Sequence, residues 1–141
     1  RKTAHYVKDL QDWASYVGIV IGQPSVFPVN SVRAMRGALI AQDDGKLVPF
    51  VRAVFESYWG DLEDISLPEV IGRIATSLGY DAAAFIAKTD DPAIKNRLRA
   101  NTDELIARGG FGSPTMFVNG EDMYFGNDRL PLVEAALMRG R

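Results

Sequence analysis

The sequence predicts an α/β fold that is mostly helical, with its strands confined to the C-terminal part. About six helical patterns follow one another before any strand pattern occurs. Two short strand patterns, Thr115 to Val118 and Asp122 to Phe125, then flank Asn119-Gly120, a dipeptide that tolerates the positive φ angles of a tight hairpin. A closing helix directs four apolar side chains toward this hairpin: Leu130, Val133, Leu137 and Met138. Because two strands make no stable sheet alone, the hairpin needs further strands or the support of the helices.

Three helical patterns occupy the first part of the chain. An amphipathic helix runs from about Thr3 to Val17, because its apolar residues recur on one face. Asn30 or Ser31 caps the second helix, which continues through Ala41, since either side chain accepts a hydrogen bond from free first-turn amides. The third helix runs from about Lys46 to Trp59 and carries an apolar stripe.

Three more helices are predicted before the strands. Ser66 to Glu69 has the pattern of a capping box, and the helix that it opens continues to about Leu78. Asp81 caps a short helix rich in alanine, and Asp91-Pro92 opens the next helix. Gly109-Gly110 ends that helix, so the strand region begins directly afterwards.

Composition and charge exclude several classes of function. The 141 residues are 47% hydrophobic, enough for a core, and their net charge of −2 disfavours binding to nucleic acid or to an anionic membrane. There is no Cys, so these residues offer no disulfide and no Cys-x-x-Cys redox pair. The single His, His5, excludes a His-based cluster, and we expect no metal. No segment approaches the roughly 18 apolar residues of a membrane span, which favours a cytoplasmic protein.

A motif near the C-terminus carries the most specific information in the chain. It comprises Gly112 to Gly120, with Ser113-Pro114 at the start of a strand, and Met123 to Arg129. This motif resembles the C-terminal part of thioredoxin-fold proteins related to the bacterial disulfide oxidoreductases. It is similar above all to the glutathione-dependent branch that contains 2-hydroxychromene-2-carboxylate isomerase and the kappa-class glutathione transferases. Phe27 to Ser31 and Arg97 to Thr102 resemble the helical insertion of that family.

The resemblance implies a division of the chain into two parts. Residues 1–110 correspond to the α-helical insertion domain, and residues 111–141 to the C-terminal ββα part of a thioredoxin-like domain. In that family a βαβ unit precedes the insertion, and we expect this sequence to begin after it. The Ser that faces the glutathione sulfur in the isomerase and kappa branch lies in that unit. No catalytic residue is therefore assigned within this chain.

Ser113-Pro114 is the first candidate binding element. A Pro that opens a strand cannot donate to the ladder, and an X-Pro bond at such a place can be cis. The resemblance implies that the backbone N–H and C=O of Ser113 bind the cysteinyl part of glutathione. The alternative is a structural proline, cis or trans, with no ligand.

Gly126-Asn127-Asp128 is the second candidate glutathione-binding element. A helix N-terminus concentrates free amides and partial positive charge, so it can hold the carboxylate of a γ-glutamyl group. The carboxylate of Asp128 can pair with the ammonium group of the same ligand. The alternative is helix capping by Asn127 or Asp128, which needs no ligand.

Asn30 is the candidate substrate-binding residue. The resemblance implies that it lies where the helical insertion faces the cleft and where relatives contact an aromatic substrate. An Asn amide can orient a carboxylate or hydroxyl group without adding charge. The alternative is the capping role described above.

The family resemblance implies a glutathione-dependent cis–trans isomerase acting on a small aromatic carboxylate in aromatic-compound breakdown. Its cofactor is glutathione, and the family resemblance implies a homodimer. A thiol–disulfide oxidoreductase related to DsbA, or a kappa-class glutathione transferase, is the first alternative. A non-catalytic helical module that binds a partner through an apolar surface is the second.

Overall fold

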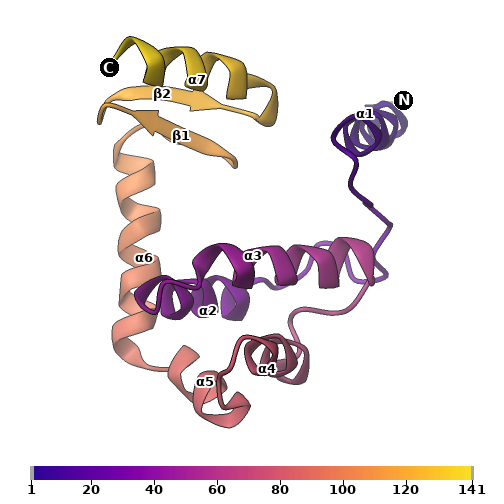
Figure 1. The fold of residues 1–141 in the computed structure, drawn as a ribbon, viewed down its shortest axis with the longest axis vertical. Helices are drawn as coiled ribbons and strands as arrows, with labels where there is room; N and C mark the ends of the chain where they lie inside the picture. The colour runs from indigo at the N-terminus through magenta and orange to yellow at the C-terminus, as the bar shows by residue number, and fades with distance from the viewer. Residues whose placement is uncertain (1, 141) are drawn as a thin grey trace. The chain divides into compact units, whose positions relative to one another are not determined.

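A computed structural model describes residues 2–140 of the chain. The helices, shown in Figure 1, are α1 (Lys2–Val17), α2 (Val32–Asp43), α3 (Leu47–Phe55), α4 (Pro68–Ser77), α5 (Ala82–Thr89), α6 (Pro92–Ala107) and α7 (Leu130–Arg139). A π-helix, η1 (Glu56–Gly60), continues α3, and a 3-10 helix, η2 (Asn127–Arg129), precedes α7. The strands are β1 (Thr115–Val118) and β2 (Asp122–Phe125).

The chain forms two compact units, which are described separately. The division falls within α6, between Leu98 and Arg99. The helical unit comprises the residues up to Leu98, and the hairpin unit comprises those from Arg99 onward. The sequence places the domain boundary later, at residues 110 and 111, and that boundary stays a prediction.

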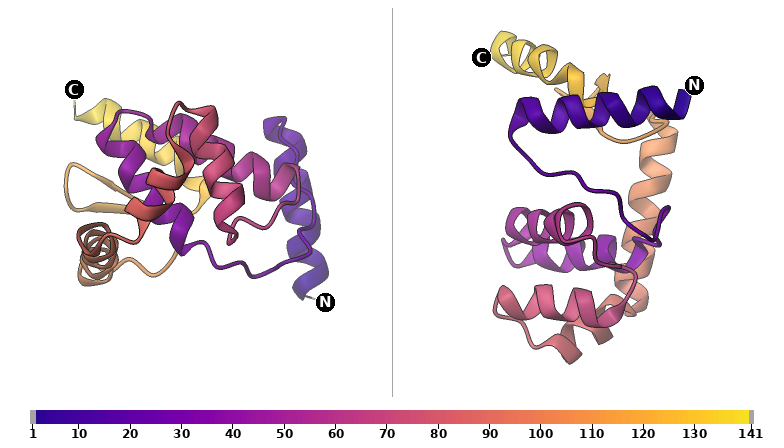
Figure 2. Two further views of the ribbon diagram at one scale, coloured as in Figure 1. Left: turned by 90° about the horizontal axis from the view of Figure 1, so that it is seen from below. Right: turned by 90° about the vertical axis from the view of Figure 1, so that its right-hand side faces the viewer.

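The hydrophobic core of the helical unit lies between α2, α3, α4 and α5, which pack against one another (Figure 2). Phe50, Ile40 and Ile71 are its largest fully buried apolar side chains. Gly37 lets α2 approach the aromatic rings of this core closely. A β-carbon at Gly37 would lie 2.7 Å from Cζ of Phe50 and 3.1 Å from Cε1 of Phe85.

Three predicted helix starts are confirmed by their hydrogen bonds. Asp81 accepts a bond from the Ala84 amide at 2.8 Å, and Asn30 accepts one from the Val32 amide at 3.1 Å. At the start of α6, Asp91 likewise accepts a bond from the Ala93 amide at 2.8 Å. In each case a side-chain oxygen satisfies an amide that has no partner inside the helix.

The predicted capping box at Ser66 is wrong. The Ser66 hydroxyl donates instead to Oδ1 of Asp64 at 2.5 Å, and the N-cap residue of α4 is Leu67. Leu67 makes no side-chain cap. The carboxylate of Asp64 also accepts the Ser66 amide at 2.9 Å, so a local turn takes the place of the reciprocal cap.

The helix predicted to end at Trp59 changes its hydrogen bonding in its last turn. The Asp61 amide donates to the Glu56 carbonyl at 2.9 Å, five residues back, as in a π-helix. Glu63 fixes this turn, because its amide donates to the Ser57 carbonyl at 2.9 Å and its carboxylate accepts the Ser57 hydroxyl at 2.5 Å. Arg73 of α4 donates to the same carboxylate at 2.5 Å.

Charged groups tie the outer helices of the helical unit together. Asp90, at the end of α5, lies 3.4 to 3.6 Å from the cationic groups of Arg33, Arg36 and Lys95. Arg97 of α6 donates to both carboxylate oxygens of Asp43 at the end of α2. These contacts hold α2 against the turn between α5 and α6.

The hairpin unit has the strands that the sequence predicts. Thr115 pairs with Phe125, and Val118 pairs with Asp122, in an antiparallel register. Asn119 and Gly120 both have positive φ angles, 52° and 93°, as the Asn-Gly dipeptide predicts for a tight turn.

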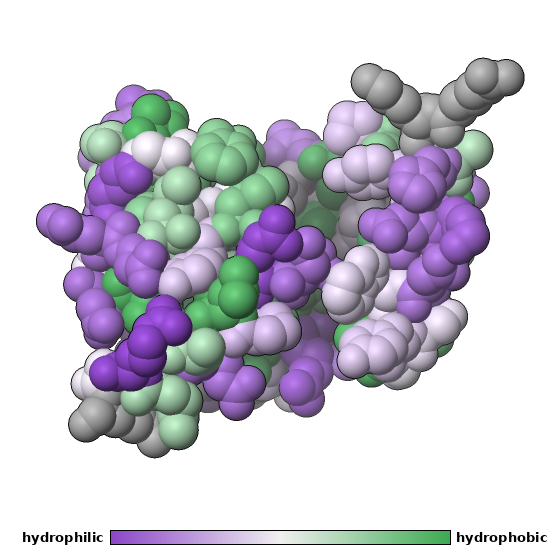
Figure 3. Space-filling view, turned by 90° about the horizontal axis from the view of Figure 1, so that it is seen from above, coloured by the Kyte–Doolittle hydropathy of each residue, from purple (hydrophilic) through white to green (hydrophobic). Residues whose placement is uncertain are grey.

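Three of the four apolar side chains of α7 that the sequence predicts to face the sheet are left largely exposed by the two strands, and the direction in which they face stays a prediction. Leu130, Leu137 and Met138 are each more than half exposed, whereas Ala136 is buried. The two described strands leave these three larger side chains exposed, and only the small side chain of Ala136 is buried on this helix. Figure 3 shows one view of the surface, on which hydrophobic side chains, in green, remain among hydrophilic ones.

The contact at Gly37 predicts opposite effects for two glycine substitutions. Gly37→Ala places a methyl group against buried rings, and overpacking of this kind costs about 1 to 3 kcal/mol. Gly72→Ala in α4 is the matched control, because its β-carbon would lie an ordinary 3.4 Å from Cβ of Ala82. Alanine also favours a helix by about 1 kcal/mol over glycine, so this control is expected to be neutral or stabilising. Urea unfolding measures the stability of each variant. Equal urea midpoints for Gly37→Ala and Gly72→Ala would contradict the close packing at Gly37.

The contacts of Glu63 predict a pH-dependent contribution to stability. Hydrogen bonds from Arg73 and then Ser57 lower the pKa of the Glu63 carboxyl group. A lowered pKa in the folded state stabilises the protein above the ordinary carboxyl pKa, and this contribution is lost as pH falls through the folded value. Urea unfolding of Glu63→Gln should therefore show a loss of stability near pH 7, about 1 kcal/mol or less, and a smaller loss at pH 3, below the ordinary carboxyl pKa. An equal loss at both pH values would show that the charge of Glu63 has no part in it.

Candidate functional site

The hairpin brings the two predicted glutathione-binding elements together. The Ser113–Pro114 peptide bond is cis, and Pro114 directly precedes β1. Gly126 directly follows β2, and its amide donates to the Pro114 carbonyl at 3.0 Å. This bond extends the pairing of the two strands by one step. Ser113 and Gly126 therefore lie at the same end of the hairpin, although thirteen positions separate them in the sequence.

The turn before β1 is held by a local bond and by close packing. The Thr115 hydroxyl donates to the Gly112 carbonyl at 2.6 Å. A β-carbon at Gly112 would lie 2.8 Å from Cε2 of Phe125, so glycine leaves room for that ring. The rings of Phe111 and Phe125 are 4.6 Å apart between centroids.

The backbone groups of Ser113 have no partner in the part of the chain that the structure describes. Neither its N–H nor its C=O makes a hydrogen bond among residues 2–140, and the residue is exposed. A donor and an acceptor on one exposed residue can form two antiparallel bonds with an extended peptide.

Asp128 does not cap a helix, and neither does Asn127, so the predicted capping roles are wrong. The N-cap residues of η2 and α7 are Gly126 and Arg129, and no side chain makes a capping hydrogen bond at either position. The physical reason is that a 3-10 turn precedes α7, which places both residues inside helical structure. Their side chains are exposed and carry no capping bond.

The Asp128 carboxylate has a defined position. Its Oδ2 accepts a hydrogen bond from Nη1 of Arg129 at 2.5 Å, and both side chains are about half exposed. Its Oδ1 lies over Gly126, where a β-carbon would approach it to 2.7 Å. Gly126 has a φ of 105°, in the region that favours glycine. Glycine at 126 therefore provides both the backbone conformation and the space that the carboxylate occupies.

Tyr124 lies on the same hairpin but offers no reactive phenolate. Its hydroxyl donates to Oδ2 of Asp122 at 2.8 Å. This hydrogen bond, with smaller contributions from burial and from the charge of Asp122, raises the pKa of Tyr124. The phenol therefore stays protonated near neutral pH.

Asn30 belongs to the helical unit. Its Oδ1 accepts the Val32 amide, as described above, and the residue is exposed. Its side-chain NH2 group donates no hydrogen bond within residues 2–140. One residue therefore has an oxygen used in capping and a free donor for a ligand.

The sequence did not predict two features of the structure, one in each unit. Arg129 pairs with Asp128, and a cavity in the helical unit involves Phe27 and Trp59. The aromatic residues were visible in the sequence, but only the fold shows that they line a common space.

No group of three or more His, Cys, Asp or Glu in residues 2–140 is arranged to hold a metal ion. Within the same residues, no helix has the length and hydrophobicity needed to cross a membrane.

Comparison with known protein families decides the family of this chain. The family model described as DSBA-like thioredoxin domain matches residues 1–138. The chain belongs to this family.

The chain is also similar in sequence to individual proteins, among them an isomerase and a glutathione transferase. It is 36% identical to a 2-hydroxychromene-2-carboxylate isomerase of Pseudomonas putida, over 95% of the chain and 65% of that protein. It is 28% identical to glutathione S-transferase kappa 2 of Caenorhabditis elegans, over 94% of the chain and 64% of that protein. The chain thus spans just under two thirds of the length of these relatives.

A solved structure agrees with the sequence comparison. The structure of a 2-hydroxychromene-2-carboxylate isomerase superposes with a TM-score of 0.88 at 33% sequence identity. The match covers 98% of this chain and 66% of that one. The predicted thioredoxin-like α/β fold with a helical insertion is therefore confirmed. The resemblance of the chain to the 2-hydroxychromene-2-carboxylate isomerases is confirmed as well.

Proposed function

We propose that this protein is a glutathione-dependent cis–trans isomerase that acts on an aromatic-degradation intermediate, as the name of its Pseudomonas putida relative suggests. One observation carries the proposal more than any other. The hairpin places the unpaired backbone groups of Ser113 at the same end as Gly126 and Asp128. The carboxylate of Asp128 makes no helix-capping hydrogen bond. Such a set complements an extended peptide that has a zwitterionic end, which is the chemistry of glutathione.

In the proposed complex, glutathione lies along the start of β1. The exposed N–H and C=O of Ser113 form two antiparallel bonds with its cysteinyl residue. The amides of Asn127 and Asp128, which have no partner among residues 2–140, hold the γ-glutamyl carboxylate. The Asp128 carboxylate pairs with the γ-glutamyl ammonium group. This new ion pair replaces the one between Asp128 and Arg129.

The proposed chemistry uses the thiol of glutathione as the nucleophile. Its sulfur adds to an unsaturated carbon of the substrate and forms a C–S bond, which interrupts conjugation. A former double bond then rotates as a single bond, and elimination breaks the C–S bond and regenerates the thiolate. Covalent addition divides one difficult isomerisation into easier steps. Asn30 is proposed to orient the carboxylate or hydroxyl group of the substrate through its free amide donor.

The proposal includes a homodimer and a cytoplasmic location. The cytoplasm keeps thiols reduced, so it maintains the cofactor in its reactive form. A kappa-class transferase is the second candidate function, and the kappa relative at 28% identity supports it. A thiol–disulfide oxidoreductase is favoured less, because these 141 residues contain no cysteine and any redox pair would have to come from outside them.

An activity assay tests the reaction. The protein expressed from its whole gene is mixed with 2-hydroxychromene-2-carboxylate, and the absorbance of the isomers is followed with reduced glutathione, with S-methylglutathione or with neither. We expect turnover only with reduced glutathione, because the methylated sulfur cannot add and leave. Accumulation of a stable thioether would favour the transferase. Absence of turnover in all three mixtures would refute the isomerase.

Binding of glutathione tests the site separately from the reaction. Isothermal titration of Asp128→Asn should show at least about tenfold weaker binding than the unchanged protein, because the variant loses the charge that pairs with the ammonium group. Glu121→Gln is the matched control, since Glu121 is an exposed carboxylate near the hairpin turn, away from the proposed ligand. Equal affinities for Asp128→Asn and Glu121→Gln would contradict the placement of the ligand.

A further inference from the structure

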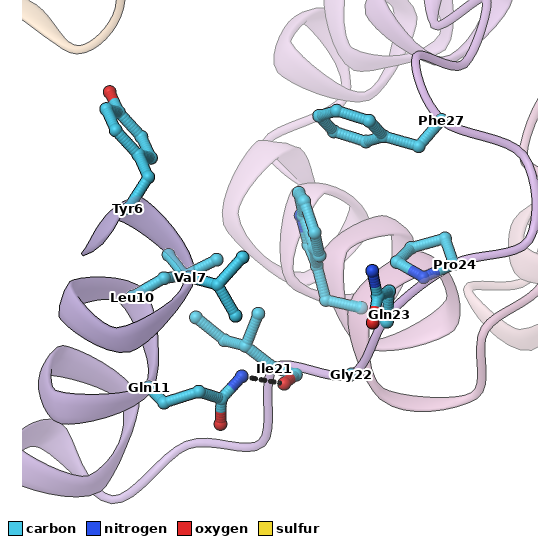
Figure 4. Close-up of a pocket in the computed structure, with 10 residues that line it drawn as sticks. Tyr6, Val7, Leu10, Gln11, Ile21, Gly22, Gln23, Pro24 and Phe27 are labelled. Carbon is cyan, nitrogen blue, oxygen red and sulfur yellow. Dashed lines mark hydrogen bonds between the residues drawn. The ribbon is translucent and has the colours of Figure 1, made fainter. Parts of the chain in front are cut away.

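A cavity of about 530 Å³ lies within the helical unit. Its lining comes from α1, from the loop between α1 and α2, and from η1: Tyr6, Val7, Leu10, Gln11, Ile21, Gly22, Gln23, Pro24, Phe27 and Trp59. In Figure 4, Val7 and Leu10 of α1 lie on one side of the cavity and Phe27 on the other, and Ile21 lies below Val7 in this view. This volume is within the range of pockets that hold small molecules.

Three hydrogen bonds fix the loop that forms one wall of the cavity. Gln11 of α1 donates to the Ile21 carbonyl at 2.8 Å, drawn as a dashed line in Figure 4. The Gly22 amide donates to the Trp59 carbonyl at 2.6 Å. The Tyr58 hydroxyl donates to the Val26 carbonyl at 2.8 Å. The loop is therefore held from both α1 and η1, so the wall exists before any ligand binds.

Gly22 is needed for this close approach. A β-carbon there would lie 2.6 Å from Cδ2 of Leu62 and 3.1 Å from the Trp59 carbonyl oxygen. Burial, with the charge of Asp64 as a smaller cause, raises the pKa of Tyr58. Its hydroxyl therefore remains a donor to Val26 at neutral pH.

The chemistry of the lining selects for an uncharged ligand. None of the ten lining residues carries a charge at neutral pH, and the only polar side chains with amide groups are Gln11 and Gln23. The rings of Phe27 and Trp59 are 6.3 Å apart between centroids and inclined at 55°. Phe27 is 71% exposed and Tyr6 is 77% exposed, so large aromatic surfaces remain open to a ligand at the cavity.

We propose that this cavity binds the uncharged ring of a flat aromatic molecule. An aromatic ring gains contacts with Phe27 and Trp59 that an aliphatic group of the same size lacks. A charged group is disfavoured, because burying a charge without a partner is costly and the lining offers none. The inference rests on the proposed function only for the choice of an aromatic compound as the ligand.

The test uses 2-naphthol, a flat aromatic alcohol that is uncharged at neutral pH. In the ¹⁵N-labelled protein expressed from its whole gene, Trp13→Phe and Trp59→Phe assign the indole N–H signals of these two residues. We expect 2-naphthol to shift the Trp59 signal saturably and to leave that of Trp13 in place, since Trp13 does not line the cavity. The anion 2-naphthoate should bind at least tenfold more weakly. Neither glutathione nor turnover enters this readout, so its outcome is independent of the activity assay.

Two substitutions on the same helix provide the matched comparison. Val7 and Val17 both lie on α1 and are 50% and 53% exposed, but only Val7 lines the cavity. Val7→Arg should weaken binding of 2-naphthol at least fivefold, and Val17→Arg should leave it unchanged. Equal binding by the two variants, or no saturable shift of Trp59, would overturn the proposal. A Trp59 shift that follows protein concentration and not 2-naphthol would assign the cavity to a second copy of the chain and would overturn it as well.

Discussion

The hydrogen bond from the Gly126 amide to the Pro114 carbonyl is the interaction on which the candidate glutathione site depends. It joins the chain before β1 to the chain after β2, so Pro114 and Gly126 lie next to each other at the open end of the hairpin. Ser113 would otherwise be an isolated exposed residue, and Asp128 an isolated exposed carboxylate. Because both groups are fixed to the same pair of strands, a single peptide ligand can contact them together.

Glycine at position 126 connects this bond to the position of the charge. Its positive φ turns the chain out of β2 and into η2, and its missing side chain leaves the space that the Asp128 carboxylate fills. Arg129 holds the other oxygen of that carboxylate. The Asp128 carboxylate thus has a defined position, and in the proposed complex the ligand ammonium group replaces its one exposed arginine contact.

Local chemistry explains which parts of the fold could be predicted from the sequence. The two strands were predicted to the residue, because Asn119-Gly120 alone specifies the turn between them. The cap by Asp81 was predicted for the same reason, since it involves only the next turn of chain. The end of α3 was not, because its π-helical turn depends on Glu63 and on Arg73 from another helix.

The same distinction applies to the candidate sites. The pattern around Ser113 and Asp128 made both residues candidates, and that assignment stays a prediction, whereas the capping role that it suggested for Asp128 is wrong because a 3-10 turn precedes α7. The cavity of the helical unit has no sequence signature, since Val7 and Trp59 are far apart in the chain and meet only in the fold. Sequence patterns therefore singled out the polar candidate residues and gave no signal for the apolar cavity.

The central claim is that the end of the hairpin formed by Ser113, Gly126 and Asp128 binds glutathione. The most direct measurement is a titration of the ¹⁵N-labelled protein with reduced glutathione, followed through the backbone amide signals. The account predicts saturable shifts concentrated at Ser113 and at Gly126 to Asp128, with the signals of the hairpin turn at Gly120 unchanged. Saturation that leaves these amides in place, or shifts centred elsewhere in the chain, would contradict it.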